Sequence, residues 1–419
     1  MPKIVIADNQ WWYSKYPLGR EVAECQYVVL NIGGRQCPMV HSEPGKDGRP
    51  THSFKFVNRE DVALWRSLAG SEVEVAIDYA GPEDPPIDLA FGDDSAIEHV
   101  DSTVPVQHLR AETTVRRAGV TRFDAYVFVD FSANSEPKAG KDSIWVGEGV
   151  FVENVLVVSA DRASNPRTRA DCASEIAGKI RGHVEAGRKV LLGLDIPYGY
   201  PHDAYPLLFP NTDSPTWSTL WSHLEHHVED LPSNRNNRFE VAASLNELAG
   251  AGLFWGCPVS KAGPHLRPTK SAPISTPEYR IVEQRLRASR RRAFSPFQLF
   301  GNGSVGSQAI LGMAMLHRLR SSPELRGLVW PYETGFQLPE NADVVHAEIW
   351  PGCIDVDLTL HPVRDAAQVL SYVKWAASHD AAGSLAGYFS DPTTNQEERA
   401  AVLRREGWIL GVGSATPRG

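Results

Sequence analysis

Four acidic residues stand where the surrounding sequence predicts a strand end or the start of a helix. Asp130 follows the apolar run FDAYVFV, Asp195 follows KVLLGL, Glu348 lies within ADVVHAEIW, and Asp365 begins the helical segment after HPVR. Apolar strands seldom end in acids unless those acids meet cations or one another. Carboxylates that converge at one sheet edge repel unless a divalent cation neutralises them, and such a cluster can hold metal ions for attack on phosphorus.

Each of these acids also has an ordinary structural explanation. Asp365 can be a charge favoured by the dipole at a helix N-terminus, and Asp195, before Ile-Pro, can be a turn residue. Taken together, the four acids predict Mg²⁺ or Mn²⁺ coordinated by Asp130, Asp195 and Asp365. Glu348 is then a further ligand or the group that activates water.

Two further segments contain groups that can bind phosphate. The segment RIVEQRLRASRRR, residues 280–292, includes Arg290 and Arg291 and is either a solvated helix face or a phosphate-binding surface. The segment FQLFGNGSVGSQ, residues 297–308, is a glycine-rich loop that enters a helix near Ser307, where free N–H groups favour an anion. It is neither a Walker A loop nor a dinucleotide fingerprint, and a plain loop with a helix cap is the alternative. The candidate contacts in this loop are Gly301, Gly303, Ser304, Ser307 and Gln308.

Three other charged residues are weaker candidates for contacts to substrate. Lys138 and Lys141 follow Asp130 in the loop NSEPKAGKDS, where they are either mobile surface charges or, beside a bound metal, contacts to substrate phosphates. Glu333 in WPYETGF either adds a ligand or holds a nearby arginine. The segment HLEHH, residues 223–227, lacks the spacing and the intervening glutamate of HExxH, so we expect no zinc there.

The order of the predicted elements indicates a fold class. After about residue 121, the runs FDAYVFVDF, DSIWVGEG and ENVLVVSA predict an antiparallel meander. A helix follows at 167–189, and then an apolar strand ends at Asp195. The order strand, strand, strand, helix, strand is that of the ribonuclease H fold. We therefore expect an α/β domain at 119–419, with a ribonuclease-H-like mixed sheet, flanking helices and a helical insertion at about 203–300.

Residues 1–118 predict a separate, small, β-rich α+β domain. The β-like runs KIVIAD, CQYVVLNIGG, HSFKFVN and VEVAIDYAG recur there, with a hairpin loop at 41–52 and one helix at 59–70. A proline-rich, acidic stretch follows at 81–107. This domain contains no catalytic constellation, and it is a candidate for oligomerisation or substrate selection.

Composition limits the class of protein. The chain has 419 residues with 42% hydrophobic content, enough for two or three domains. Its net charge of −9 disfavours nonspecific wrapping of nucleic acid but permits a local basic groove. Five cysteines without a CxxC pair indicate free thiols. Without a signal-like N-terminus or an apolar run of about 18 residues, we expect a cytoplasmic protein with no membrane partner.

Six segments of the chain resemble a known family. They are FVDFSANSEPKAGKDSIW, GLDIPYGYP, SPFQLFGNGSVGSQAILGM, WPYETGF, HAEIWPG and VRDAAQVLSYVKW, in this order. Together they resemble a bacterial family of unknown function similar to predicted ribonuclease-H-like nucleases, some of whose members are labelled by gene neighbourhood as cofactor-biosynthesis proteins. The resemblance covers about residues 121–415. It implies that Asp130, Asp195, Glu348 and Asp365 are the four acids of the site.

These features predict a metal-dependent, nuclease-like hydrolase that acts on nucleic acid or another phosphate-bearing, nucleotide-like substrate. The alternative is a biosynthetic enzyme that uses the same fold to bind a small nucleotide-like metabolite or transfer a group on it. A third class is a binding protein without catalysis, in which the acids are structural. The sequence does not distinguish a polymeric substrate from a small molecule.

Overall fold

The computed structural model divides the chain into two compact units, Met1–Arg110 and Ala111–Gly419. It describes residues 3–5, 11–13, 27–32, 35–41, 53–56, 72–80, 113–117, 119, 121–270, 276–301 and 303–413. The boundary precedes the expected one at 118 because strand β7 (Thr113–Arg116) pairs with strand β10 (Val155–Val158) of the second unit. The second unit contains all the candidate site residues.

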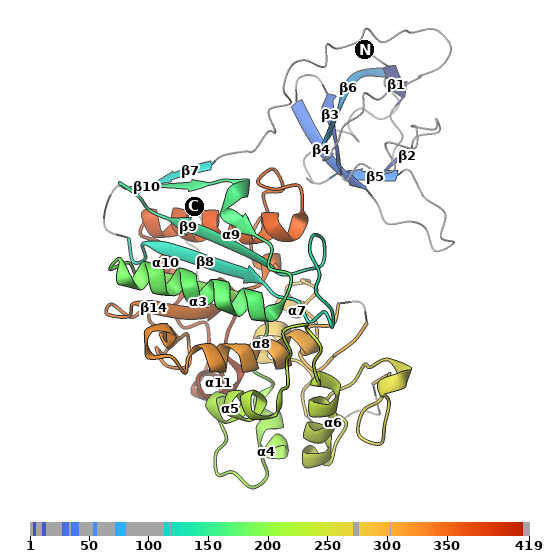
Figure 1. The fold of residues 1–419 in the computed structure, drawn as a ribbon, viewed down its shortest axis with the longest axis vertical. Coiled ribbons are helices and arrows are strands. Elements are labelled where there is room, and N and C mark those ends of the chain that lie inside the picture. Colours follow the sequence, from blue (N-terminus) through green and yellow to red (C-terminus); the bar gives the residue numbers. More distant parts are fainter. Residues whose placement is uncertain are drawn as a thin grey trace. The chain divides into compact units, whose positions relative to one another are not determined.

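The first unit is an antiparallel sheet in the order β1-β6-β3-β4-β5-β2 (Figure 1). Its strands are β1 (Lys3–Val5), β2 (Trp11–Tyr13), β3 (Tyr27–Ile32), β4 (Arg35–His41), β5 (Ser53–Phe56) and β6 (Glu72–Ala80). The sequence predicts β1, β3, β5 and β6 but misses β2 and β4. Pro38 argues against a central strand, yet it lies within β4. The expected helix at 59–70, the stretch at 81–107 and the loop after His41 lie outside the described residues.

The second unit is built around a mixed six-stranded sheet in the order β11-β9-β8-β12-β14-β13. Figure 1 labels β8, β9 and β14 of this sheet. Its strands are β8 (Ala125–Asp130), β9 (Trp145–Val150), β11 (Ala163–Ser164), β12 (Val190–Asp195), β13 (Leu328–Val329) and β14 (Val344–Glu348). Strands β8, β12, β14 and β13 are parallel, whereas β9 is antiparallel to β8 and to β11. The three central strands are buried on both faces, which explains their nearly continuous apolar sequences.

The expected three-stranded meander forms only in part. After β9 the chain turns at Glu153 and Asn154, which both have positive φ angles, 47° and 66°, and Val152 pairs with Val155. The next strand, β10, then pairs with β7 in a separate two-stranded sheet, and β11 lies beside β9 instead. The prediction was wrong here because the partner of β10 precedes β8 in the sequence, and local pattern does not report such a pairing.

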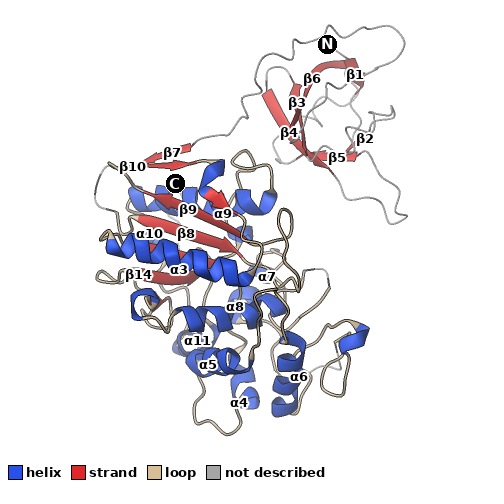
Figure 2. Cartoon of the chain, in the orientation of Figure 1, coloured by secondary structure: helices blue, strands red, loops and turns tan. Residues whose placement is uncertain are grey.

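Helices cover both faces of the main sheet (Figure 2). They are α3 (Arg169–Glu185), α4 (Tyr205–Leu208), α5 (Trp217–His227), α6 (Arg238–Ala249), α7 (Ile281–Ala288), α8 (Gly306–Leu319), α9 (Arg364–Ala381), α10 (Leu385–Tyr388) and α11 (Gln396–Ala401). The face with Val127 and Leu192 packs against α3 and α8, and the face with Phe128 and Val345 packs against α9. No helix in the described part of the chain is long and apolar enough to cross a membrane.

The C-terminal segment leaves its helical conformation and returns to the main sheet. Helix α11 passes into a π-helical turn at Val402–Glu406, and Gly407, with φ of 71°, ends that turn. Ile409 then pairs in parallel with Glu348, and the N–H of Leu410 donates to the Glu348 carbonyl at 2.9 Å. The segment after the turn therefore lies beside the carboxyl end of β14.

Candidate active site

Two aspartates end neighbouring parallel strands at the same level of the main sheet. Asp130 is the last residue of β8, Asp195 is the last residue of β12, and the two are direct register partners. Side chains alternate along a strand, so both carboxylates belong to the face of Tyr126 and Phe128, which α9 covers. We call Asp130 and Asp195 the aspartate pair.

No cation among the described residues pairs with the aspartate pair. Neither carboxylate accepts a hydrogen bond or forms an ion pair with any residue that the structure describes. Burial raises the pKa of Asp130 well above its usual range, and the charges of Asp195, Asp365 and Asp142 raise it further. Burial, followed by the charge of Glu348, raises the pKa of Asp195 to about 8. Two carboxylates in this position either share a proton or require a bound cation.

Asp365 approaches the aspartate pair from the first turn of α9. Its Oδ2 accepts a hydrogen bond from the backbone N–H of Asp142 at 2.6 Å, which connects α9 to the loop after β8. Burial raises the pKa of Asp365, whereas the N–H of Asp142 and the charge of Lys141 lower it. Because the Asp365 charge also raises the pKa of Asp130, the third predicted acid lies within electrostatic reach of the pair.

Glu348 belongs to the opposite face of the sheet from the aspartate pair. Its register partner is Leu194, one residue before Asp195, so the alternation of side chains turns Glu348 the other way. Both of its carboxylate oxygens bind the Arg280 guanidinium, at 2.7 and 2.5 Å, and Oε2 also accepts the backbone N–H of Tyr198. This placement does not support the predicted role in holding a metal or activating water, because a buried cation already occupies both oxygens.

Arg280 is the centre of a buried cluster of opposite charges. Its side chain is 0% exposed, and it forms ion pairs with Glu283 and Glu348. Its Nη1 also donates to the backbone carbonyl of Glu406, whose buried carboxylate binds His202 Nδ1 at 2.7 Å. We call these five residues the Arg280 cluster. Arg280 carries no sign of burial in the sequence except its three-residue spacing from Glu283, whose Oε2 accepts the Arg280 backbone N–H at 2.8 Å.

The remaining arginines of segment 280–292 do not form a continuous phosphate-binding surface. Arg285 pairs with Glu398, Arg287 lies over the Tyr279 ring, and Arg292 lies over the Phe294 ring. Of the two predicted substrate contacts, Arg291 donates to the backbone carbonyl of Gly352 at 2.9 Å and so holds the turn after β14. Arg290 is exposed, with a positive φ of 60°. The prediction overestimated this segment because charge partners from other segments were invisible in the sequence.

The glycine-rich loop enters α8 as the sequence predicts, and the helix begins at Gly306. Gly301 and Gly303 have φ angles of 101° and 75°, in the left-handed region that favours glycine. The N–H of Ser304 donates to the Gly301 carbonyl at 3.2 Å and closes the turn. These three predicted contacts therefore shape the loop backbone.

Two other predicted contacts in this segment hold neighbouring chain. Ser307 Oγ donates to the Leu299 carbonyl at 2.7 Å. Gln308 Nε2 donates at 2.7 Å to the carbonyl of Phe131, the residue directly after Asp130. The first turn of α8 thus lies against the segment that follows the first aspartate.

The structure places the three weaker candidates in different settings. Lys138 lies on the exposed loop, with its Nζ 3.9 Å from Asp142 Oδ2. Lys141 lowers the pKa of Asp365, so it lies near the acids. Glu333 binds Arg320 Nη2 at 2.5 Å, which matches the second of its two expected roles.

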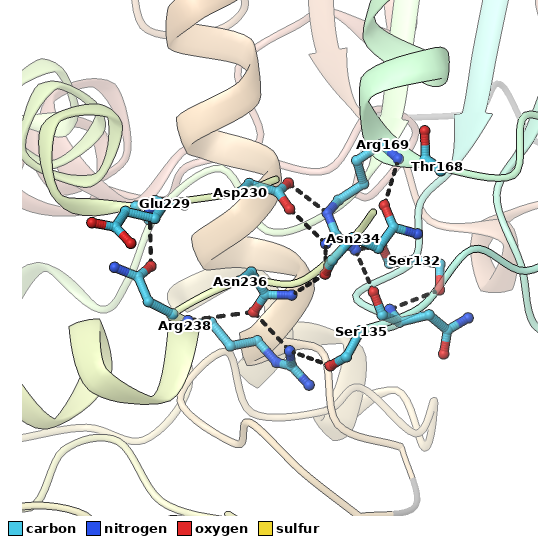
Figure 3. A network of polar contacts seen from close by, with 12 residues as sticks. Ser132, Ser135, Thr168, Arg169, Glu229, Asp230, Asn234, Asn236 and Arg238 are labelled. Atoms are coloured by element: carbon cyan, nitrogen blue, oxygen red, sulfur yellow. Dashed lines mark hydrogen bonds and ion pairs between the residues drawn. The ribbon is translucent and has the colours of Figure 1, made fainter. Parts of the chain in front are cut away.

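A hydrogen-bonded network fixes the loop after Asp130 (Figure 3). Arg169 is 2% exposed and binds both oxygens of Asp230, at 2.6 and 2.7 Å. It also donates to the backbone carbonyls of Ser132, Asn134 and Asn234. The sequence does not indicate this network, because its members come from separate segments and no local spacing connects them.

Mg²⁺ is compatible with the aspartate pair, although a larger ligand set is not assembled. Across the described ranges, no three histidine, cysteine, aspartate or glutamate side chains converge closely enough to hold a metal ion. Mg²⁺ usually keeps several waters and binds proteins through one or two carboxylates together with substrate phosphates. Asp130 and Asp195 provide those two carboxylates, whereas Asp365 already accepts the N–H of Asp142.

No protein-family model, no curated protein and no solved structure matches the chain. Fold alone would not identify an activity in any case, because many folds host unrelated functions. The geometry and charge of the site are therefore the basis for a functional proposal.

Proposed function

We propose that this chain is a divalent-cation-dependent hydrolase of phosphodiester or other phosphate-bearing substrates, with the aspartate pair at its centre. The main support is the register that places two carboxylates side by side without a described protein cation. Strongly perturbed pKa values of this kind cluster at functional sites. Divalent cations held by carboxylates are a recurrent arrangement for attack on phosphorus.

The order of elements supports a ribonuclease-H-like interpretation of the second unit. Without β10, which belongs to a separate sheet, the chain order is β8, β9, β11, α3 and β12, which is strand, strand, strand, helix, strand. Strand β11 takes the third position, in place of the run that forms β10. Both aspartates follow apolar strands of this core, as the resemblance implies for the acids of such a site.

In this proposal the chain positions the reactants. Asp130 and Asp195 hold the cation, and Lys141 and Asp365 set the charge around it. A bound Mg²⁺ or Mn²⁺ supplies charge stabilisation at the phosphorus oxygens and lowers the pKa of bound water. Glu348 is a positioning residue, because its hydrogen bond from the Tyr198 N–H at 2.9 Å fixes the turn after Asp195.

Calorimetric titration of Mg²⁺ and Mn²⁺ tests the metal site. Wild type should bind, and Asp130→Asn and Asp195→Asn should each weaken binding more than about 10-fold, because each removes one of two charged ligands. Asp357→Asn is a matched control, since Asp357 already binds Lys374 at 2.8 Å. Absence of binding to wild type, or unchanged affinity in both pair variants, contradicts the proposal.

Substrate assays separate the polymer from the small molecule. The protein is incubated with single- and double-stranded DNA and RNA, and then with mononucleotides. Cleavage of polymers that disappears in Asp195→Asn supports a nuclease. Turnover restricted to monomers supports the biosynthetic alternative.

A further inference from the structure

Arg238 is a buried arginine whose hydrogen-bond acceptors are all neutral. It is 9% exposed and lies at the start of α6. Its Nε donates to Ser307 Oγ at 2.9 Å. Its Nη1 donates to Ser135 Oγ at 3.0 Å and to Asn236 Oδ1 at 2.7 Å (Figure 3). Charged side chains are almost never buried without a partner of opposite charge, so this arrangement needs an explanation.

The two carboxylates whose charges act on Arg238 are bound to other cations. Asp230 binds Arg169 through both oxygens, and Glu240 binds Lys261 at 2.6 Å. Arg238 itself forms no ion pair within the described part of the chain. Burial, followed by the charge of Arg169, lowers the pKa of Arg238 to about 10. The Phe239 ring, whose centroid lies 4.4 Å from the guanidinium carbon, contacts Arg238, but no described carboxylate forms an ion pair with it.

Arg169 shows how an arginine with a purely structural role is satisfied in the same network (Figure 3). A guanidinium has five N–H donors, and Arg169 uses all of them, two on a carboxylate and three on backbone carbonyls. Arg238 uses only Nε and Nη1, and its Nη2 makes no hydrogen bond to a described residue. Two donors on a fixed guanidinium thus remain for a ligand.

The residues that hold Arg238 also connect it to the segment that follows Asp130. Ser135, which Nη1 contacts, lies on the loop after β8. Ser307, which Nε contacts, lies in the first turn of α8, and its neighbour Gln308 binds the Phe131 carbonyl. The positive end of the α8 dipole adds to the attraction for an anion at this place.

We propose that Arg238, held by Ser135 and Ser307, binds a phosphate group of the substrate. The phosphate oxygens would take the place of the missing carboxylate, since a guanidinium presents donors in a geometry that matches phosphate. This inference rests on the proposed function, because it takes the substrate of the aspartate pair to carry phosphate. It adds a binding residue that lies outside the three segments in which the sequence predicted phosphate contacts.

Calorimetry with inorganic phosphate in metal-free buffer tests the role of Arg238 separately from the metal site. Wild type should bind phosphate, and Arg238→Met should weaken that binding about 10-fold or more. Arg238→Lys keeps the positive charge but loses the paired N–H donors of the guanidinium, so it should bind phosphate with intermediate affinity. Both variants should bind Mg²⁺ as wild type does, whereas Asp130→Asn should lose Mg²⁺ and keep phosphate. The two proposals can therefore fail independently.

Thr168→Ala is the control for general damage to the network. Thr168 caps α3 by accepting the N–H of Asp171 at 3.0 Å, and none of the Arg238 hydrogen bonds involves it. This variant should keep the wild-type phosphate affinity. Absence of phosphate binding by wild type, an unchanged affinity in Arg238→Lys, or an equal loss in Thr168→Ala overturns the proposal. If Arg238→Met does not fold, Arg238→Lys decides the question.

Competition identifies the source of the phosphate. A nucleoside 5′-monophosphate that displaces inorganic phosphate as well as a short single strand does supports a terminal phosphate as the ligand. Displacement by the strand alone supports an internucleotide phosphate. If neither the nucleoside monophosphate nor the strand displaces inorganic phosphate, the proposal that Arg238 binds a substrate phosphate is overturned.

Discussion

Two groups of acids lie at the carboxyl edge of the same sheet, on opposite faces. The register partner of Glu348 is Leu194, one residue before Asp195. The aspartate pair ends β8 and β12 without a described cation. Glu348 ends β14 within the Arg280 cluster, where a buried guanidinium binds both of its oxygens. An acid at a strand end is therefore not a sign of chemistry by itself. What separates the two groups is whether the fold supplies the opposite charge.

The two groups also affect stability differently. Removing one partner of a buried ion pair is costly because the remaining charge loses its compensation. An uncompensated pair of like charges instead lowers the stability of the folded state until a proton or a cation neutralises it. We therefore expect substitutions in the Arg280 cluster to destabilise the fold, and substitutions in the aspartate pair to abolish cation binding without destabilising it.

The largest effect is expected for Arg280→Met. This change leaves Glu283 and Glu348 buried without their cation, and it should lower the free energy of unfolding by about 3–5 kcal/mol. Chemical denaturation measures the loss. Arg290→Met is the matched control from the same segment, because Arg290 is exposed, and it should stay within about 0.5 kcal/mol of wild type.

A double variant sharpens this prediction. Arg280→Met combined with Glu348→Gln removes one of the charges that Arg280→Met leaves unpaired, so it should recover part of the lost stability. The Gln side-chain oxygen can still accept the Tyr198 N–H. A loss below about 1 kcal/mol in Arg280→Met would show that the cluster is not held together by its charges, and the contrast with the aspartate pair would disappear.

The next effect is the pH dependence caused by Asp195. Its pKa of about 8 in the folded protein lies above the value of about 3.9 expected for the unfolded chain. The folded state therefore binds the extra proton in this window, and the stability of wild type falls as pH rises from about 4 to about 8. Asp195→Asn removes this dependence. The free energy of unfolding of the variant should therefore rise relative to that of wild type across the window, and the difference should stay constant above it.

Denaturation of both proteins at several pH values, with and without Mg²⁺, measures this effect. A cation that binds only the folded wild type should restore its stability, because binding to the native state shifts the unfolding equilibrium. Mg²⁺ should leave Asp195→Asn nearly unchanged. A stability difference between Asp195→Asn and wild type that decreased as pH rose would have the opposite sign to the expected one. It would show that the folded protein neutralises the charge of the Asp195 carboxylate.

Local sequence pattern was sufficient for one group of acids and not for the other. Asp130 and Asp195 could be identified because each ends an apolar run, and strand ends are a local property. Glu348 has the same local signature, but the face of the sheet that it occupies depends on the register between β12 and β14. Register across parallel strands is set by distant packing, so the sequence grouped all three acids together.

Local sequence pattern also did not reveal that Arg169 and Arg280 are buried. An arginine is most often exposed, and only a partner from elsewhere in the chain changes that expectation. The partner of Arg169 is Asp230, and the cluster of Arg280 includes Glu348 and Glu406, all distant in sequence. Helices with continuous apolar spacing, such as α3 and α9, did not depend on such partners and were predicted.

The smallest effect is expected at the rim of the Arg280 cluster, at His202. Its backbone N–H and its Nδ1 both bind Glu406 Oε1, at 2.8 and 2.7 Å, and the bond to Glu406 raises the pKa of His202 although burial opposes it. The stabilisation by the interaction of His202 with Glu406 is therefore complete below the unfolded pKa of about 6.5 and is lost as pH rises through the higher folded pKa.

His202→Gln should lower the free energy of unfolding by about 1 kcal/mol below about pH 6.5 and by less above the folded pKa, as denaturation at the two pH values would show. His226→Gln, on the exposed side of α5, should show no such change. If His202→Gln lost as much free energy of unfolding as Arg280→Met, the histidine and not the buried guanidinium would be the main source of charge compensation in the cluster.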